Sequence, residues 1–301
     1  MSATLRALAP GKTNLGLFLG PTREDGLHEL VSLIEPLSLA DELSLEEIDS
    51  DVDEVVCPGV EGPNLAAVAL ARYRAASGWD GPAQRLTIVK RVPVAAGMGG
   101  GSGDAAAALR LVAQAAGRPH DLLIEQLAPG LGADVPSQLQ PGPVLVYGAG
   151  EHVERVAPPS PHGLLVIPSQ ERLSTPEVFR EADRLGLGRS LEELLELRER
   201  LREGLSPDLL VNDLEPAARS LCASIDAALA AARAAGADHA FVSGSGPTVI
   251  GLFWGARGEE AAARAADTLR ERFPGAVAAR PVGHEFAAVG PVRNNGASHE
   301  Q

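Results

Sequence analysis

The sequence predicts an α+β protein of two lobes, with a division near residue 150. Three observations lead to this class. The front of the chain is rich in strand patterns, an alanine-rich helical block follows, and the second half mixes strands with helices. Residues 148–161 are polar, contain glycine and proline and lack periodicity, which is typical of a boundary. The 301 residues, 45% of them hydrophobic, are enough for a domain at 1–150 and a second at 151–301.

In the first half, alternating or β-branched residues predict strands at 4–8, 14–19, 27–45 with interruptions, and 85–92. Helices are expected at 64–76, with Asn64 as the N-cap, at 102–116 and at 120–127. Residues 141–147 have the pattern of another strand.

In the second half, strands are expected at 163–167, 239–243, 248–253 and near residues 276 and 285. Helical periodicity predicts helices at 175–185, 190–203, 215–235 and 259–273. The composition of the tail after Gly290 favours an unordered segment.

Composition argues against several classes of partner. The formal net charge is −14, and no segment clusters lysine and arginine densely enough to follow a nucleic acid. Cys57 and Cys222 are far apart and have no CxxC motif or histidine-rich neighbourhood, so neither a disulfide framework nor a zinc site is expected. No run approaches the ~20 apolar residues of a membrane span, and Pro10 and Lys12 interrupt any signal-peptide core. We therefore expect a soluble, cytoplasmic protein.

The stretch PVAAGMGGGSGDAAAAL at 93–109 places glycines between an expected strand and an expected helix. Bare backbone lets N–H groups approach an anion, and a helix N-terminus adds roughly half a positive charge. An ordinary flexible turn is the alternative, but a turn needs one or two glycines and this stretch has five. The pattern predicts a loop that binds phosphate.

Two well-known phosphate loops do not fit this stretch. A GxxxxGK[ST] loop is absent because no lysine follows the glycines, and the GKT at 11–13 has Arg6 where the first glycine should stand. A dinucleotide fingerprint can be placed on Gly101, Gly103 and Ala106. The helix that follows leads to another helix, however, and not to the second strand that this fingerprint requires.

Two further stretches have two readings each. VSGSGPTVIGLF at 242–253 fits a tight hairpin or a second backbone wall beside a ligand. In GLGADVPSQL, Asp134 precedes a short helical pattern and fits either an N-cap or a general base. The residues alone favour the cap.

Taken together and in order, APGKTNLGL at 9–17, the glycine stretch and VSGSGPTVIGLF resemble the three motifs of the GHMP kinase superfamily. DGLHEL at 25–30, LGADVPSQL at 131–139, LSTPEVF at 173–179 and NDLEPAA at 212–218 resemble one branch of it. That branch phosphorylates a cytidine-diphosphate-linked methylerythritol in non-mevalonate isoprenoid synthesis. The resemblance implies an N-terminal lobe like the second domain of ribosomal protein S5, a ferredoxin-like C-terminal lobe and a cleft between them.

The resemblance also implies roles for individual residues, with ATP and Mg²⁺ as cofactors and the magnesium ligands unassigned. Asp134 matches the family's catalytic aspartate, and Lys12 matches the lysine beside it. Asn14, His28, Thr175, Phe179, Gly244, Ser245 and Gly246 match positions around the substrate, with His28 at the edge of the cytosine and Phe179 stacked on its face. The ATP phosphates would lie against Pro93, Val94, Ala95, Ala96, Gly97, Met98, Gly99, Gly100, Gly101, Ser102, Gly103 and Asp104.

The chain departs from the family's pattern at Leu27, where the family usually has tyrosine. One side of the cytosine would then meet an apolar side chain that is not aromatic. Two alternatives stay open at this point. The first is another GHMP kinase, such as mevalonate or homoserine kinase. The second is a nucleotide-binding regulator without activity, although such a protein would need neither Lys12 nor Asp134.

Overall fold

The computed structural model describes residues 4–60 and 62–291. The predicted tail after Gly290 lies almost entirely outside the described residues. The strands are β1 (Leu5–Thr22), β2 (His28–Glu47), β3 (Glu54–Val56), β4 (Gln84–Val89), β5 (Val144–Gly148), β6 (His152–Arg155), β7 (His162–Ile167), β8 (His239–Val242), β9 (Val249–Trp254), β10 (Val277–Ala279) and β11 (Gly290–Pro291). The helices are α1 (Leu65–Ser77), α2 (Gly100–Ala115), α3 (Leu123–Leu127), α4 (Val135–Leu139), α5 (Thr175–Leu185), α6 (Leu191–Glu203), α7 (Glu215–Leu221), α8 (Ser224–Ala234) and α9 (Gly258–Leu269).

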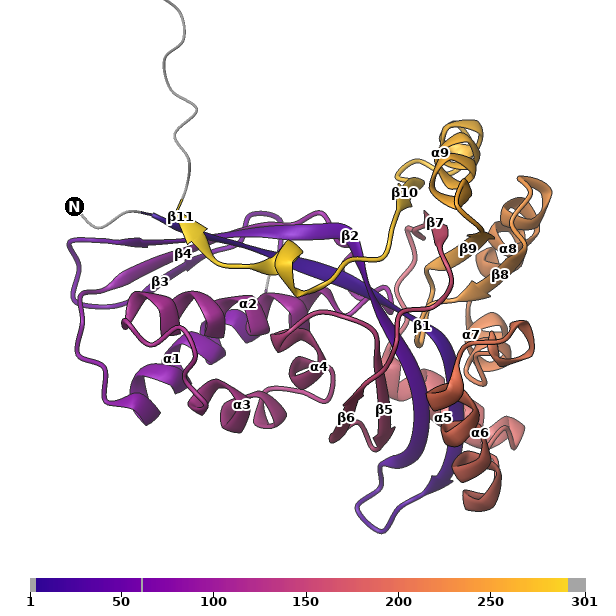
Figure 1. Cartoon of the computed structure of the whole chain (residues 1–301), viewed down its shortest axis with the longest axis horizontal. Coiled ribbons are helices and arrows are strands. Elements are labelled where there is room, and N and C mark those ends of the chain that lie inside the picture. The colour runs from indigo at the N-terminus through magenta and orange to yellow at the C-terminus, as the bar shows by residue number, and fades with distance from the viewer. Residues whose placement is uncertain (1–3, 61, 292–301) are drawn as a thin grey trace, which may run out of the picture.

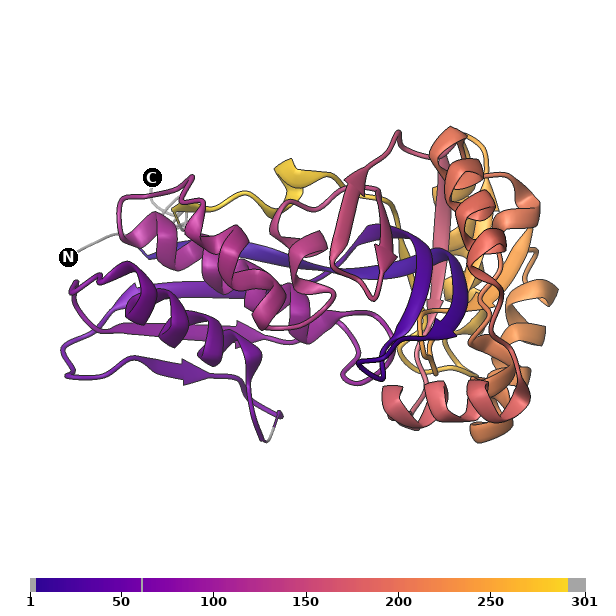
Figure 2. The same cartoon turned by 90° about the horizontal axis from the view of Figure 1, so that it is seen from below.

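The strands form two sheets, and the two lobes of the predicted α+β fold lie side by side along the long axis (Figures 1 and 2). The first sheet has the order β11-β1-β2-β4-β3, with β5 on the other half of β2 and β6 beside β5. Helices α1 to α4 lie on one side of it (Figure 1). The second sheet has the order β10-β7-β9-β8 and packs against α8 and α9.

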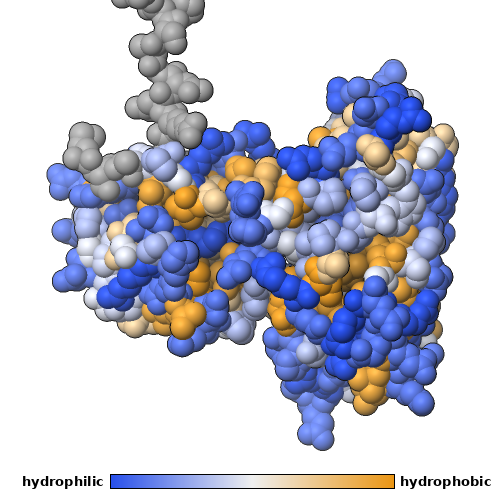
Figure 3. Space-filling view, in the orientation of Figure 1, coloured by the Kyte–Doolittle hydropathy of each residue, from blue (hydrophilic) through white to orange (hydrophobic). Residues whose placement is uncertain are grey.

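Strands β1 and β2 join the lobes, because each is long enough to reach from the first lobe into the second. A buried cluster at this junction combines Phe18 of β1 and Leu33 of β2 with Leu164 of β7 and Ile250 of β9. Each lobe also has a core of its own. The shared core fixes the position of the second lobe relative to the glycine loop. The molecular outline narrows to a notch between the lobes (Figure 3).

Several elements form where their local signals predict them. Helix α5 has the predicted bounds, and the Asn64 side chain accepts a hydrogen bond from the Ala66 N–H at the start of α1. Ser190 and Glu193 form a capping box at α6.

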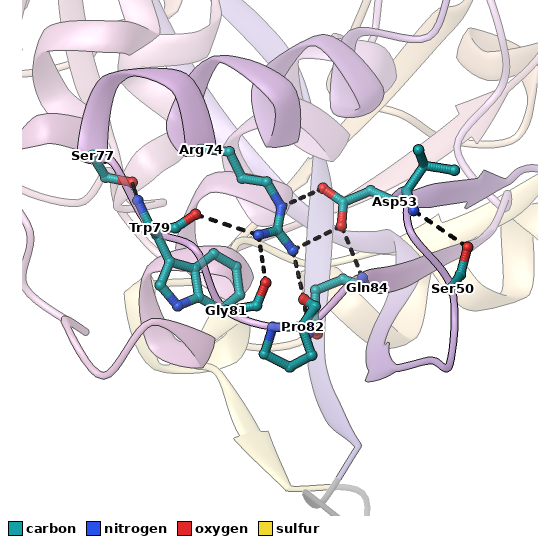
Figure 4. Close-up of polar contacts among 9 residues, drawn as sticks. Ser50, Asp53, Arg74, Ser77, Trp79, Gly81, Pro82 and Gln84 are labelled. Atoms are coloured by element: carbon teal, nitrogen blue, oxygen red, sulfur yellow. Dashed lines mark hydrogen bonds and ion pairs between the residues drawn. The ribbon is translucent and has the colours of Figure 1, made fainter.

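At the C-terminal end of α1, Arg74 pairs with Asp53 and donates to the carbonyls of Gly81 and Pro82 (Figure 4). These contacts tie the helix to the edge of the sheet.

Other expectations were wrong. The predicted strands at 4–8 and 14–19 are one continuous strand, which absorbs Pro10 at a register shift between Pro10 and Lys12. The predicted helix 215–235 is two helices, because Cys222 adopts extended backbone and the chain turns there so that both helices pack into one core. The expected strand near Glu285 is a 3-10 helix over His284–Ala287.

Strand β6 lies inside the segment predicted as an irregular boundary and pairs with β5, so the first sheet continues to Arg155. The division at residue 150 stays a prediction. Within the described residues, no helix is both long and apolar enough to cross a membrane.

Candidate active site

The glycine loop connects β4 to α2 and opens the N-terminus of a 16-residue helix. Ala95, Gly97 and Gly99 have φ values of 53°, 77° and 65°, so the loop backbone turns repeatedly through the left-handed region. The first N–H groups of α2 have no intrahelical acceptor, and Gly99 offers no side chain to cap them. These donors and the positive end of the helix dipole can together hold an anion.

A cluster of charged side chains stabilises the glycine loop. The Lys90 ammonium lies 2.5 Å from Asp41 Oδ2 and 2.7 Å from Asp104 Oδ2. The other oxygen of Asp41 accepts the backbone N–H groups of Arg91 and Val92 at 2.5 and 2.8 Å. Burial raises the pKa of the Asp104 carboxyl to about 7, although the nearby Lys90 ammonium favours the ionised carboxylate. The cluster fixes both the start of the loop and the first turns of α2.

The turn at 243–246, between β8 and β9, closes on the glycine loop. A Cβ added at Gly97 would lie 2.0 Å from the carbonyl oxygen of Ser243, and the Ser243 hydroxyl lies 3.2 Å from the Gly97 carbonyl. Asn212 holds the turn by donating to the carbonyls of Val242 and Gly244 at 2.8 and 2.7 Å. The stretch at 242–253 therefore fits both interpretations: it is a tight hairpin, and its turn forms a backbone wall beside the glycine loop.

Lys12 and Asp134 meet beside the loop. Lys12 Nζ lies 3.5 Å from Asp134 Oδ2, and the two side chains are 6% and 38% exposed. Asp134 stands at the N-cap position of α4, but its side chain makes no capping hydrogen bond. The N-cap reading was therefore wrong, and the carboxylate is available for chemistry beside an ammonium.

A buried hydrogen-bond chain orients Lys12. Its ammonium donates to Asn14 Oδ1 at 2.8 Å, Asn14 Nδ2 donates to Ser32 Oγ at 2.7 Å, and the Ser32 hydroxyl donates to the Gly16 carbonyl at 2.7 Å. The Lys12 backbone N–H also donates to the carbonyl of Met98 at 2.9 Å. Since an ammonium has three donors, Asn14 and Asp134 leave one for a further acceptor.

At the other end of the site, His28 of β2 faces α5. Its ring centroid lies 5.2 Å from that of Phe179, and its Nε2 lies 2.7 Å from Asp183 Oδ1. The hydroxyl oxygens of Thr175 in α5 and Ser245 in the turn between β8 and β9 lie 2.9 Å apart, which ties α5 to that turn. The Leu27 side chain is exposed beside this group.

One cavity of about 1030 Å³ gathers these groups. Its volume is at the upper end for small-molecule sites, which suits two ligands. Most of the predicted site residues line it, together with Leu27, Lys90 and Asp183. Three do not: Met98 is buried in the core that joins the lobes, while Gly103 and Gly246 allow close packing against the Pro10 carbonyl and the Val242 side chain. In the described part of the chain, no three His, Cys, Asp or Glu side chains are grouped to hold a metal ion.

Sequence reasoning missed Lys90, Asp41 and Asp183. Asp41 and Lys90 are 49 positions apart and share no motif, so only the pairing of β2 with β4 brings them together. Asp183 had a weak signal, because it follows Phe179 by one helical turn and therefore lies on the same face of α5.

Comparisons with known proteins agree with this geometry. Residues 64–142 match the model of the GHMP kinases N terminal domain, and residues 182–275 match that of the GHMP kinases C terminal. The chain is 37% identical over 278 residues to 4-diphosphocytidyl-2-C-methyl-D-erythritol kinase of Anaeromyxobacter sp. (strain Fw109-5), covering 89% of this chain and 87% of the relative.

Solved structures match as well. A crystal structure of 4-(cytidine 5'-diphospho)-2C-methyl-D-erythritol kinase superimposes with a TM-score of 0.74 at 35% identity, covering 92% of this chain and 99% of that one. Homoserine kinase from Cytophaga hutchinsonii has a TM-score of 0.69 at 18% identity, covering 96% and 98%, which is a likeness of fold. The chain therefore belongs to the GHMP kinases, in the family of the 4-diphosphocytidyl-2-C-methyl-D-erythritol kinases.

Proposed function

We propose that the protein transfers the γ-phosphoryl group of ATP to the 2-hydroxyl of 4-diphosphocytidyl-2-C-methyl-D-erythritol. The observation that carries the proposal is the convergence of Lys12, Asp134 and the glycine loop on one cavity. Phosphoryl transfer is mostly positioning and neutralisation of charge, and this cavity offers an anion cradle, an ammonium and a carboxylate. The relatives of matching length carry the name of this kinase.

The chemistry we propose is a direct displacement. The substrate's 2-hydroxyl oxygen bonds to the γ-phosphorus while the bond from that phosphorus to the β,γ-bridging oxygen breaks, and ADP leaves. Asp134 accepts or orients the hydroxyl proton, and Lys12 stabilises negative charge on the group in transfer. The chain from Lys12 through Asn14 to Ser32 supports these roles, because it limits the positions that the ammonium can take.

For the donor, we propose that backbone N–H groups at 97–102 hold the ATP phosphates, with the Ser102 hydroxyl beside them, whereas the Gly103 N–H already donates to the Gly99 carbonyl. Mg²⁺ commonly binds through substrate phosphates, waters and one or two protein oxygens, so the Ser102 hydroxyl fits as a protein ligand of MgATP. The metal would neutralise phosphate charge.

For the acceptor, we propose that the cytosine lies between Leu27 and Phe179 with His28 at its edge, and that the turn at 244–246 closes over the diphosphate. Leu27 stands where the family pattern implies a tyrosine. The two free cysteines, Cys57 and Cys222, fit a cytoplasmic setting.

An assay that couples ADP release to a signal tests the function. We expect turnover with the cytidine-linked methylerythritol and little or none with mevalonate or homoserine. Turnover with one of the latter alone would instead assign the chain to another GHMP activity. ATP binding without turnover on any of the three would support a silent regulator.

A further inference from the structure

We propose that Asp183 is a positioning residue that sets the tautomer of His28 and thereby selects cytosine over uracil. This inference rests on the proposed function, because it assigns a specificity role within the same site. The inference is based on one contact: the Asp183 carboxylate on α5 lies beside one ring nitrogen of His28, which lines the ligand cavity.

The hydrogen bond decides which ring nitrogen carries a proton. Asp183 Oδ1 lies 2.7 Å from His28 Nε2, and an ionised carboxylate can only accept. Nε2 is therefore the protonated nitrogen, and in the neutral ring Nδ1 bears a lone pair. Thr22 Oγ1, 3.2 Å from the same Nε2, adds a second acceptor on that side.

The ligand then meets the edge of His28 that Asp183 and Thr22 leave open. The Nε2 edge is occupied, so the edge for a base is the one that carries the Nδ1 acceptor. Cytosine presents an amino group at C4, which donates to such an acceptor. Uracil presents a carbonyl oxygen there, and two lone pairs would face each other.

The geometry of α5 makes Asp183 suited to this role. Phe179 and Asp183 are one helical turn apart on the same face, so one rigid element supplies both the stacking ring and the carboxylate. The His28 side chain is 8% exposed, whereas that of Asp183 is 50% exposed. Removing the Asp183 carboxylate should therefore change the orientation of His28 without emptying a core position.

The first test is the ¹⁵N spectrum of histidine-labelled protein, with His28 assigned by its loss in His28→Gln. We expect a protonated Nε2 and a bare Nδ1 in the neutral ring of the wild type, and a mixture of tautomers in Asp183→Ala. A wild-type ring protonated at Nδ1 would overturn the inference, whatever the enzyme's activity.

The second test compares binding of CDP and UDP by calorimetry, with a non-hydrolysable ATP analogue present to fill the donor site. We expect the preference for CDP to fall by about tenfold in Asp183→Ala, the effect of one lost oriented hydrogen bond. Asp183→Asn should keep most of the preference, because its carbonyl oxygen can still accept from Nε2–H.

The matched control is Glu177→Ala, which removes an exposed carboxylate from the first turn of the same helix. It should leave the preference unchanged. An equal CDP preference in Asp183→Ala and the wild type would refute the role of Asp183. Failure of the wild type to phosphorylate the cytidine substrate would instead refute the proposed function, so the two failures are distinguishable.

Discussion

Replacing Gly97 with alanine should disable the kinase, because this position carries two separate constraints. Its φ of 77° lies in the left-handed region, which costs a residue with a Cβ about 1–2 kcal/mol. Its added Cβ would lie 2.0 Å from the Ser243 carbonyl oxygen and 2.9 Å from the Gly246 nitrogen. Both neighbours are backbone atoms, so no flexible side chain can move aside.

The size of the effect follows from the displacement that the clash forces. To restore even a 3.0 Å contact, the loop or the facing turn must move by about 1 Å, and a misplacement of that size can lower catalysis about 10²-fold. We expect kcat/KM for ATP to fall at least about 100-fold in Gly97→Ala. The free energy of unfolding should fall by about 2–5 kcal/mol, the sum of backbone strain and overpacking.

Two control variants separate the causes. In Gly101→Ala, in the first turn of α2, the added Cβ meets only Leu65 Cδ1 at 3.9 Å, so the free energy of unfolding should not fall. Gly186→Ala has a φ of 68° and nothing within 4 Å, so it should lose stability alone. Steady-state kinetics and urea unfolding measure all three. Wild-type kcat/KM in Gly97→Ala would refute the close contact between loop and turn.

Three further predictions follow from other parts of the molecule. Leu27→Tyr should tighten CDP binding in calorimetry, since stacking on a base is worth roughly 1–3 kcal/mol in nucleic-acid complexes, and equal affinities would reject the stacking explanation. Arg110→Met should lower the free energy of unfolding in urea by about 2–4 kcal/mol, because the Arg110 guanidinium donates to the carbonyls of Leu8, Gln138 and Leu139. A change below about 0.5 kcal/mol would contradict this structural role. Burial alone would lower the pKa of His162, but the hydrogen bond to Glu35, the negative charge of Glu35 and the hydrogen bond to the Ser160 carbonyl together outweigh burial, and the net shift is upward. The stabilisation by this pair is then complete below the unfolded pKa of about 6.5 and is lost as pH rises through the folded pKa. His162→Gln should therefore lower the free energy of unfolding more at about pH 6 than at about pH 9. A cost that does not change with pH would contradict the charged pair.

The sequence predicted well those features that depend on neighbouring residues. Helix α5, the Asn64 cap and the position of the glycine loop depend on signals within a few residues, and the structure has them at or near the predicted bounds. The order of motifs along the chain, read as a resemblance, correctly indicated the family. The pairing of Lys12 with Asp134 came from that resemblance and not from any local pattern.

Features that depend on packing could not be predicted from local signals. Pro10 lacks an N–H and therefore suggested a break between strands, but a register shift lets β1 continue past it. After Pro216, no glycine or proline interrupts the segment up to residue 235, and only the shared core requires the turn at Cys222. The Lys90 cluster joins strand β2, the residue after β4 and helix α2, so no spacing within one element could reveal it.

The central claim is that Asp134 acts on the substrate's hydroxyl beside Lys12 and the ATP phosphates. Single-turnover phosphoryl transfer by Asp134→Asn, at saturating ATP and cytidine-linked methylerythritol, tests it most directly. Since Asp134 makes no capping hydrogen bond, this variant should fold and bind ATP like the wild type. We predict that transfer slows by about 10² to 10⁴, the usual contribution of a positioned acid or base. Transfer at the wild-type rate would remove Asp134 from the mechanism.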